Sequence, residues 1–112
     1  MSLRVVYTDD FPADVAAQAR WYARQRDEAL ALDYAEAVEA TLEFLAQHPE
    51  LGTPCQYPEP QLAGLRFYLV KKQFDRHLIY YRISGSELVA FRVVPGARDL
   101  PRRLLDPPGA EG

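Results

Sequence analysis

The chain has 112 residues, 48% of them hydrophobic and 26% charged, which is the balance of one small globular domain rather than of a disordered or fibrous protein. No run approaches the roughly 20 consecutive apolar residues of a membrane-spanning helix, and the start MSLRVVYTDD has no secretory signal pattern. The single cysteine, Cys55, excludes an internal disulfide, so we expect a cytoplasmic protein with one domain at residues 1–106 and a disordered tail at 107–112.

Charge is unevenly divided along the chain, although the net charge is only -3. Residues 1–63 hold four arginines and eleven acidic residues, a net charge of -7, whereas residues 64–112 hold nine basic and five acidic residues, a net charge of +4. The second half is therefore the one suited to a polyanion or to an acidic protein segment.

The first expected element is a strand at residues 3–8, where LRVVYT is short and rich in β-branched residues. The next four residues, DDFP, favour a helix start, because aspartate can cap backbone N–H groups and proline is tolerated in the first turn. We predict a helix over residues 12–26. The apolar residues of its buried stripe are spaced three to four apart and are Phe11, Val15, Ala19 and Tyr22.

A second helix is predicted from a cap at Asp27 to His48, because Pro49 disfavours helical backbone in the residue before it. The short break between the two helices favours an antiparallel hairpin. The inner face of the second helix is expected to carry Ala31, Tyr34, Ala35, Val38, Leu42 and Leu45.

Residues 50–63 contain three prolines and a glycine, and we expect an irregular connection within the domain. Cys55 lies there without a basic neighbour in the sequence, which favours an inert thiol over a reactive one.

Residues 64–99 are predicted to form three short antiparallel strands, with a tight turn at Ser84-Gly85-Ser86. Alternate side chains of a strand point to opposite faces of the sheet. The rows expected to face the helices are Leu65, Phe67 and Leu69, then Ile79, Tyr81 and Ile83, then Val89, Phe91 and Val93. The predicted fold is therefore α+β, a helical hairpin packed on a small antiparallel sheet of three to four strands.

The opposite face of this sheet is predicted to be open and rich in arginine. Guanidinium groups bind phosphates and carboxylates through paired hydrogen bonds, and tyrosine rings stack on bases or on arginines. The residues predicted to bind a partner are Arg66, Arg76, Tyr80, Arg82, Arg92 and Arg98, with Tyr68 on the same face. The alternative is that the arginines only cover an exposed sheet with their aliphatic parts.

The groups needed for acid–base chemistry are scarce. RNA cleavage needs one group to accept a proton and another to donate one, and arginine does neither well because its pKa is above about 12. His77 is expected at a strand end or in the core, and His48 closes a helix. The sequence holds no metal-ligand cluster and no glycine-rich phosphate loop, so we predict no metal and no cofactor.

The run GLRFYLVKKQFDRHLIYYRISGSELVAFRVVPGARDL resembles the C-terminal half of the RelE/ParE superfamily of type II toxin–antitoxin toxins. The most specific pieces are Gly64-Leu65-Arg66, the strand Ile79-Tyr80-Tyr81-Arg82 and the turn Gly96-Ala97-Arg98-Asp99. The resemblance covers nearly all of residues 3–105. It implies an antitoxin that wraps and neutralises the toxin. Toxins of this superfamily have two main activities, which are mRNA cleavage on the ribosome and poisoning of DNA gyrase.

Two departures from the RelE-like nucleases favour the ParE-like branch. Arg98 falls where those enzymes place a phosphate-stabilising arginine. However, Pro95 stands where many of them have histidine, and Leu104 stands near the position where others have a catalytic tyrosine. The favoured hypothesis is thus a toxin that inhibits gyrase by binding. The alternatives are a ribosome-dependent mRNA endonuclease using Arg66, Tyr80 and Arg98, and a non-toxic antitoxin-binding relative.

The expected partners are a cognate antitoxin and either gyrase or the ribosome with its mRNA, with no membrane. The oligomeric alternatives are a homodimer and a toxin–antitoxin hetero-oligomer. We expect an acidic, partly disordered antitoxin to bind chiefly across Arg76, Arg82, Arg92 and Arg98, and the alternative is that it lies along the helical hairpin.

Overall fold

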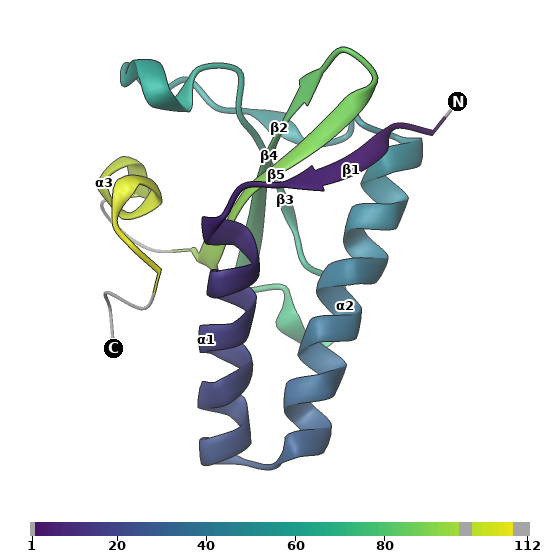
Figure 1. The fold of residues 1–112 in the computed structure, drawn as a ribbon, viewed down its shortest axis with the longest axis vertical. Coiled ribbons are helices and arrows are strands. Elements are labelled where there is room, and N and C mark those ends of the chain that lie inside the picture. Colours follow the sequence, from purple (N-terminus) through teal and green to yellow (C-terminus); the bar gives the residue numbers. More distant parts are fainter. Residues whose placement is uncertain (1, 97–99, 109–112) are drawn as a thin grey trace.

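The computed structural model describes residues 2–96 and 100–108 and shows two long helices packed on a sheet (Figure 1). In chain order the elements are β1 (Arg4–Tyr7), α1 (Asp10–Gln25), α2 (Glu28–Gln47), β2 (Thr53–Pro54), η1 (Pro60–Leu62), β3 (Arg66–Leu69), η2 (Lys72–Phe74), β4 (His77–Ser84), β5 (Glu87–Pro95) and α3 (Leu100–Leu105). The α+β class and the helical hairpin are confirmed, while β2 and α3 are additions to the predicted elements.

The sheet has five strands in the order β1-β5-β4-β3-β2. The strand β1 runs parallel to β5, and all other neighbours are antiparallel. The prediction of three to four antiparallel strands is wrong for two reasons. A two-residue strand within the proline-rich connection pairs with β3, and β1 joins the other edge of the sheet parallel to β5.

The hairpin has nearly the bounds that its periodicity predicted. The helix α1 begins at Asp10 rather than at residue 12, and Asp9 before it makes no side-chain capping bond. The cap of α2 is as predicted, since Asp27 Oδ1 accepts a hydrogen bond of 2.8 Å from the backbone N–H of Leu30. The buried residues on its inner face include Tyr34, Val38, Leu42 and Leu45.

A β-bulge changes which side chains of β5 face the helices. Tyr80 pairs with Arg92 whereas Tyr81 pairs with Ala90, so one residue of β5 is left without a partner in β4. An extra residue reverses the alternation beyond it. Because of this, Leu88, Ala90 and Val93 belong to the core beneath the helices, while Phe91 packs in the core on the other face. The predicted inward direction of Val89 and Phe91 is therefore wrong.

The strand β3 also presents the opposite parity from the prediction. Tyr68 packs against the core beneath the helices, and Phe67 packs on the far side of the sheet. Leu69 is 49% exposed. Apolar side chains point to both faces of this strand, so the sequence pattern alone does not show which face packs against the helices.

The second face of the sheet is covered rather than open. The core there, which we call the second core, consists of buried Leu62, Leu65, Tyr80, Val94 and Leu104, with Cys55 and Tyr57 packed against it. These residues come from the connection around η1, from β4 and β5, and from α3, which Figure 1 shows on the side of the sheet away from α2. The predicted open face does not form, because the η1 connection, which precedes these strands in the sequence, and α3, which follows them, both pack apolar side chains on it.

Candidate functional site

The two arginines nearest the β2 connection bind the chain's own backbone. Arg66 donates to the carbonyl oxygens of Glu50 and Gly52, at 3.1 and 2.8 Å. Arg82 donates to the carbonyl of Gln61 at 2.8 Å, and its guanidinium lies 5.2 Å from the centre of the Phe91 ring. Each arginine thus holds a loop in place, with part of its charge already satisfied.

Tyr80 lies in the second core with no exposed surface. Burial raises the pKa of its phenol, so the hydroxyl is a poor proton donor or acceptor for a substrate. Arg66 pairs across the sheet with Tyr81, and the adjacent Tyr80 therefore points to the opposite face. The arrangement of Arg66 and Tyr80 in one nuclease site is contradicted, as is a surface role for Tyr80.

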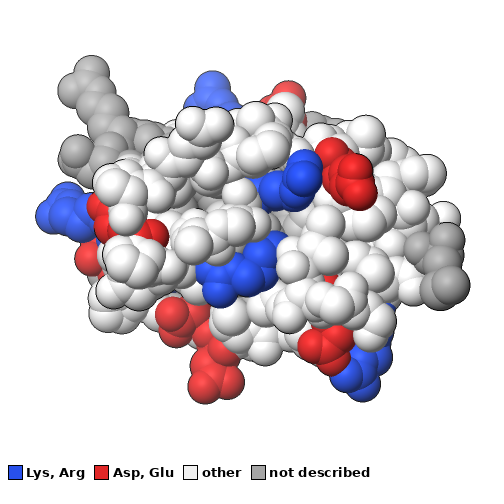
Figure 2. Space-filling model, turned by 90° about the horizontal axis from the view of Figure 1, so that it is seen from above, with Lys and Arg blue, Asp and Glu red and all other residues white. Residues whose placement is uncertain are grey.

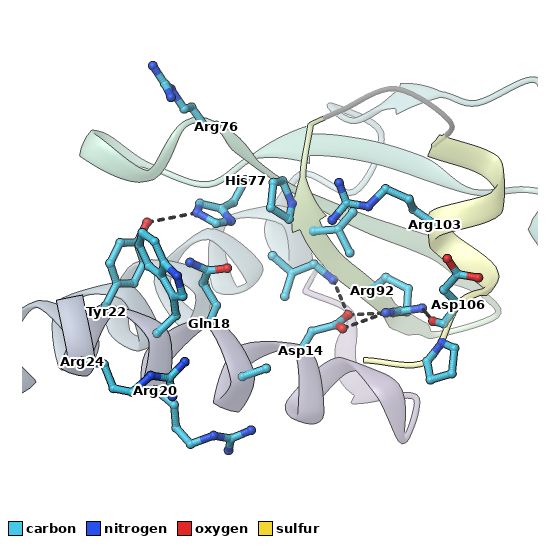
Figure 3. Close-up of a pocket in the computed structure, with 16 residues that line it drawn as sticks. Asp14, Gln18, Arg20, Tyr22, Arg24, Arg76, His77, Arg92, Arg103 and Asp106 are labelled. Atoms are coloured by element: carbon cyan, nitrogen blue, oxygen red, sulfur yellow. Dashed lines mark hydrogen bonds and ion pairs between the residues drawn. The ribbon is translucent and has the colours of Figure 1, made fainter. Parts of the chain in front are cut away.

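Arg92 is buried and ion-paired, which contradicts its predicted exposure. Its Nε and Nη2 atoms donate to Asp14 Oδ2 and Oδ1, at 2.7 and 2.8 Å (Figure 3). Its Nη1 atom donates to the carbonyls of Leu104 and Asp106. Burial alone would lower the pKa of Arg92, but the Asp14 carboxylate raises it above its ordinary value. Arg92 joins α1, β5 and α3, so its role is structural.

On the face that Figure 2 shows, basic side chains do not merge into one surface. Figure 2 shows separate blue patches, with red and white residues between them, on the face seen from above. Arg98 lies outside the described residues. Among the arginines predicted to bind a partner, Arg76 is exposed and lies beside a cleft.

This cleft, of about 670 Å³, lies between α1 and the ends of β5 and α3, and we call it the basic cleft. Five arginines line it, namely Arg20, Arg24, Arg76, Arg92 and Arg103, together with two acidic residues, Asp14 and Asp106. Ala17, Val93, Val94 and Pro95 supply apolar wall, and the indole of Trp21, 42% exposed, lies at the same site. The basic cleft therefore combines positive charge with apolar surface.

Within the described residues, Arg20, Arg24 and Arg76 form no ion pair with a carboxylate. All three side chains are exposed. In Figure 3, Arg20 and Arg24 extend from α1 at one rim of the cleft and Arg76 stands at the other. These guanidinium groups therefore surround the cleft rather than converge on a single point.

His77 closes the inner end of the basic cleft as a neutral core group, in line with its predicted place. It is 6% exposed, and burial lowers its pKa from 6.5 to about 4. Its Nε2 atom lies 3.1 Å from the Tyr22 hydroxyl (Figure 3), and its ring centre lies 5.1 Å from that of Tyr34. At neutral pH this histidine carries no charge that could help to bind an anion.

The cleft residues that the sequence pattern did not indicate are Asp14, Arg20, Trp21, Arg24 and Arg103. A signal existed for Asp14, because it is a single carboxylate inside the otherwise apolar run PADVAA. An acid in such a run needs a buried partner, but the partner lies 78 residues away and could be found only from the fold.

Two classes of site find no support in the described residues. In that part of the chain, no group of three or more histidine, cysteine, aspartate or glutamate side chains is placed to hold a metal. No helix there is long and apolar enough to cross a membrane.

Comparison with known proteins gives one family and one fold. Residues 5–100 match the family described as "ParE toxin of type II toxin-antitoxin system, parDE". A solved structure described as "Chromosomal ParDE TA system from P. aeruginosa" superposes with a TM-score of 0.69 at 18% identity, covering 86% of this chain and 98% of that chain. No curated protein matches the sequence.

The family match and the resemblance read from residues 64–100 agree, and the fold is that of the solved ParDE chain. The ParE-like branch predicted from the sequence is confirmed. This chain belongs to the ParE toxin family of type II toxin–antitoxin systems.

Proposed function

We propose that this chain is a toxin that acts in the cytoplasm by binding and inhibiting DNA gyrase, and that a cognate antitoxin neutralises it by binding. The proposal starts from the family and from the structural relative, which is itself described as part of a ParDE toxin–antitoxin system. It requires no covalent chemistry from this chain.

One observation supports binding over RNA cleavage. Arg66 and Tyr80, two of the three residues that a nuclease mechanism would use, lie on opposite faces of the sheet, and Tyr80 is completely buried. Acid–base catalysis needs its groups within hydrogen-bonding reach of one substrate. The buried His77, already in contact with Tyr22, is also poorly placed to exchange protons with a substrate.

The test is a supercoiling assay with purified gyrase and a relaxed plasmid. We expect increasing amounts of the chain to reduce supercoiling and to trap cleaved DNA, and we expect prior mixing with the antitoxin to prevent both. A type I topoisomerase acting on the same plasmid is the control, because it should be unaffected.

The same preparation is added to a translation extract, and mRNA integrity is followed by primer extension. Intact mRNA together with loss of supercoiling supports the proposal. Unaffected gyrase together with mRNA cutting that disappears in Arg98→Ala would replace it with the endonuclease. No effect in either assay by a chain that still binds the antitoxin would indicate a non-toxic relative.

A further inference from the structure

The cations of the basic cleft outnumber the acids around them. Five arginines and two acidic residues line the cleft, a local net charge of +3, although the net charge of the whole chain is -3. One of the acids, Asp14, is already bound to Arg92. Among the described residues, the exposed Arg20, Arg24 and Arg76 have no carboxylate partner. Their charge is therefore available to an anionic ligand.

The positions of these three arginines suit a row of anionic groups. Arg20 and Arg24 are one turn apart on α1, a spacing at which like charges repel each other and a bound anion relieves the repulsion. Arg76 stands at the opposite rim, so a single small anion could not reach all three (Figure 3). A nucleic acid strand carries one phosphate per nucleotide, so it can place successive phosphates beside guanidinium groups that are spread across a cleft.

The accessible surface between the arginines favours a nucleic acid over a protein segment. The valines in the wall, Val93 and Val94, are only 3% and 6% exposed, so they offer little of the apolar contact found at the centre of protein interfaces. The large accessible side chain is Trp21, which is 42% exposed and lies between Arg20 and Arg24 in the sequence. Single strands bind where bases stack on an aromatic ring beside cations that hold the phosphates.

The charge and size of the molecule limit the ligand to a short stretch of one strand. Residues 1–63, which include the hairpin, have a net charge of -7 and repel phosphates that extend beyond the cleft. A duplex, whose major groove alone is about 12 Å wide, is too broad to enter a cleft of about 670 Å³. We therefore expect modest affinity for free DNA and a need for DNA that another protein presents.

We propose that the basic cleft binds a short stretch of one DNA strand, with phosphates at Arg20, Arg24 and Arg76 and a base stacked on Trp21. The chain attaches in this way to the DNA that gyrase holds. This inference rests on the proposed function, because gyrase supplies the DNA. Of the residues predicted to bind a partner, the site includes Arg76.

The first experiment titrates the chain with a six-nucleotide thymidine strand, the DNA probe, and follows Trp21 fluorescence. This signal reports on the cleft because the chain has one tryptophan. The test variant is Arg20→Gln with Arg76→Gln. The matched control is Arg4→Gln with Arg26→Gln, which removes the same charge from exposed arginines that do not line the cleft. Circular dichroism checks that both variants are folded.

We expect the DNA probe to quench Trp21 fluorescence. The slope of log K against log salt concentration should be about -2, since each phosphate contact with a single strand contributes about -0.7. The test variant should raise Kd at least about 10-fold at low salt and reduce the slope to about -0.7, because two of the three contacts are lost. The control should raise Kd less than about 3-fold, since remote charges are screened.

The second experiment measures the concentration of each variant that halves supercoiling by gyrase. We expect this concentration to rise at least about 10-fold for the test variant and less than about 3-fold for the control, because lost phosphate contacts weaken attachment to the complex of gyrase with DNA. These results, together with binding of the DNA probe, support the inference.

Each remaining outcome overturns a particular statement. No quenching by the DNA probe, or equal Kd values for the test and control variants, would overturn the DNA site and leave gyrase inhibition as a separate result. Weaker inhibition by the test variant with unchanged binding of the DNA probe would assign the cleft to the gyrase protein instead.

Two further outcomes separate the ligand from the target. A six-nucleotide uridine RNA strand that binds at least about 10-fold more tightly than the DNA probe would reassign the cleft to RNA, since the 2′-hydroxyl is the group that distinguishes the two. Binding of the DNA probe as expected, without gyrase inhibition by the unaltered chain, would overturn the proposed function and the attachment to gyrase-held DNA, and the DNA site itself would stand.

Discussion

Arg92 shows how one buried charge can organise this small domain. Its guanidinium meets Asp14 through two hydrogen bonds and binds two carbonyls at the end of α3, and Asp14 also accepts a hydrogen bond of 3.1 Å from the backbone N–H of Val93. Desolvating both charges has a cost that this geometry offsets. The main effect of the pair is therefore to specify how α1 and α3 dock on β5, and its net contribution to the free energy of unfolding is small.

The first prediction concerns removal of one partner of this pair. Asp14→Ala leaves the Arg92 guanidinium buried without its carboxylate, and we expect it to lower the free energy of unfolding by about 3–5 kcal/mol. Urea denaturation followed by Trp21 fluorescence measures the change.

The control is Glu87→Gln, which breaks the exposed pair with Arg4 and should cost less than about 1 kcal/mol. The double variant Asp14→Leu with Arg92→Met removes both charges and should be more stable than Asp14→Ala. A double variant less stable than the single one would contradict the view that an uncompensated charge causes the loss.

The second prediction follows from the lowered pKa of His77. Between pH 6.5 and about 4 the unfolded chain binds a proton at this residue that the folded chain does not, so stability decreases as the pH falls through this window. The shift corresponds to about 3 kcal/mol at its full extent.

Urea denaturation at about pH 7, 5 and 4 gives the stability at each step, and NMR titration of the imidazole gives the pKa directly. Many carboxylates titrate in the same range, so the comparison is with His77→Gln, which can still hydrogen-bond Tyr22. We expect this variant to lose less stability than the unaltered chain, whereas equal losses would show that His77 titrates normally.

At the scale of secondary-structure elements, the short helix α3 forms only because it docks on the rest of the chain. With six residues it is too short to be stable alone, and it is held by the buried Leu104 and by carbonyls that accept from Arg92. Its docking completes the second core, so this element converts a half-covered sheet into one buried on both faces.

The third prediction tests this docking. Leu104→Ala should lower the free energy of unfolding by about 2–4 kcal/mol, because a fully buried leucine leaves a cavity beside Tyr80 and Val94. Chemical denaturation measures it. The neighbouring Leu105, 44% exposed, is the control, and Leu105→Ala should change stability by less than about 0.5 kcal/mol. Equal effects would mean that α3 does not pack as described.

At the scale of the whole molecule, two cores share a single sheet. The core beneath the helices and the second core both include side chains of β4 and β5, so neither can lose its structure without exposing the other. The fourth prediction is therefore that the chain unfolds as one cooperative unit, as small single domains usually do.

The measurement compares two probes in one urea titration. Trp21 fluorescence reports on α1 near the basic cleft, and far-ultraviolet circular dichroism reports on all helices. The two midpoints should coincide, and Leu104→Ala, in the second core, should shift both equally. Separate transitions would show that the second face unfolds independently.

The sequence by itself determined the helical hairpin, the cap at Asp27, the hairpin turn at Ser84-Gly85-Ser86 and the family, because local periodicity, capping and turn chemistry act over a few residues. Tertiary structure alone decided which face each arginine occupies. A bulge opposite Tyr80 reverses parity within β5, and apolar residues from the η1 connection and α3 bury the face predicted to be open. Contacts of that kind have no local pattern, so the pairing of Asp14 with Arg92 and the basic cleft beside it follow only from the folded chain.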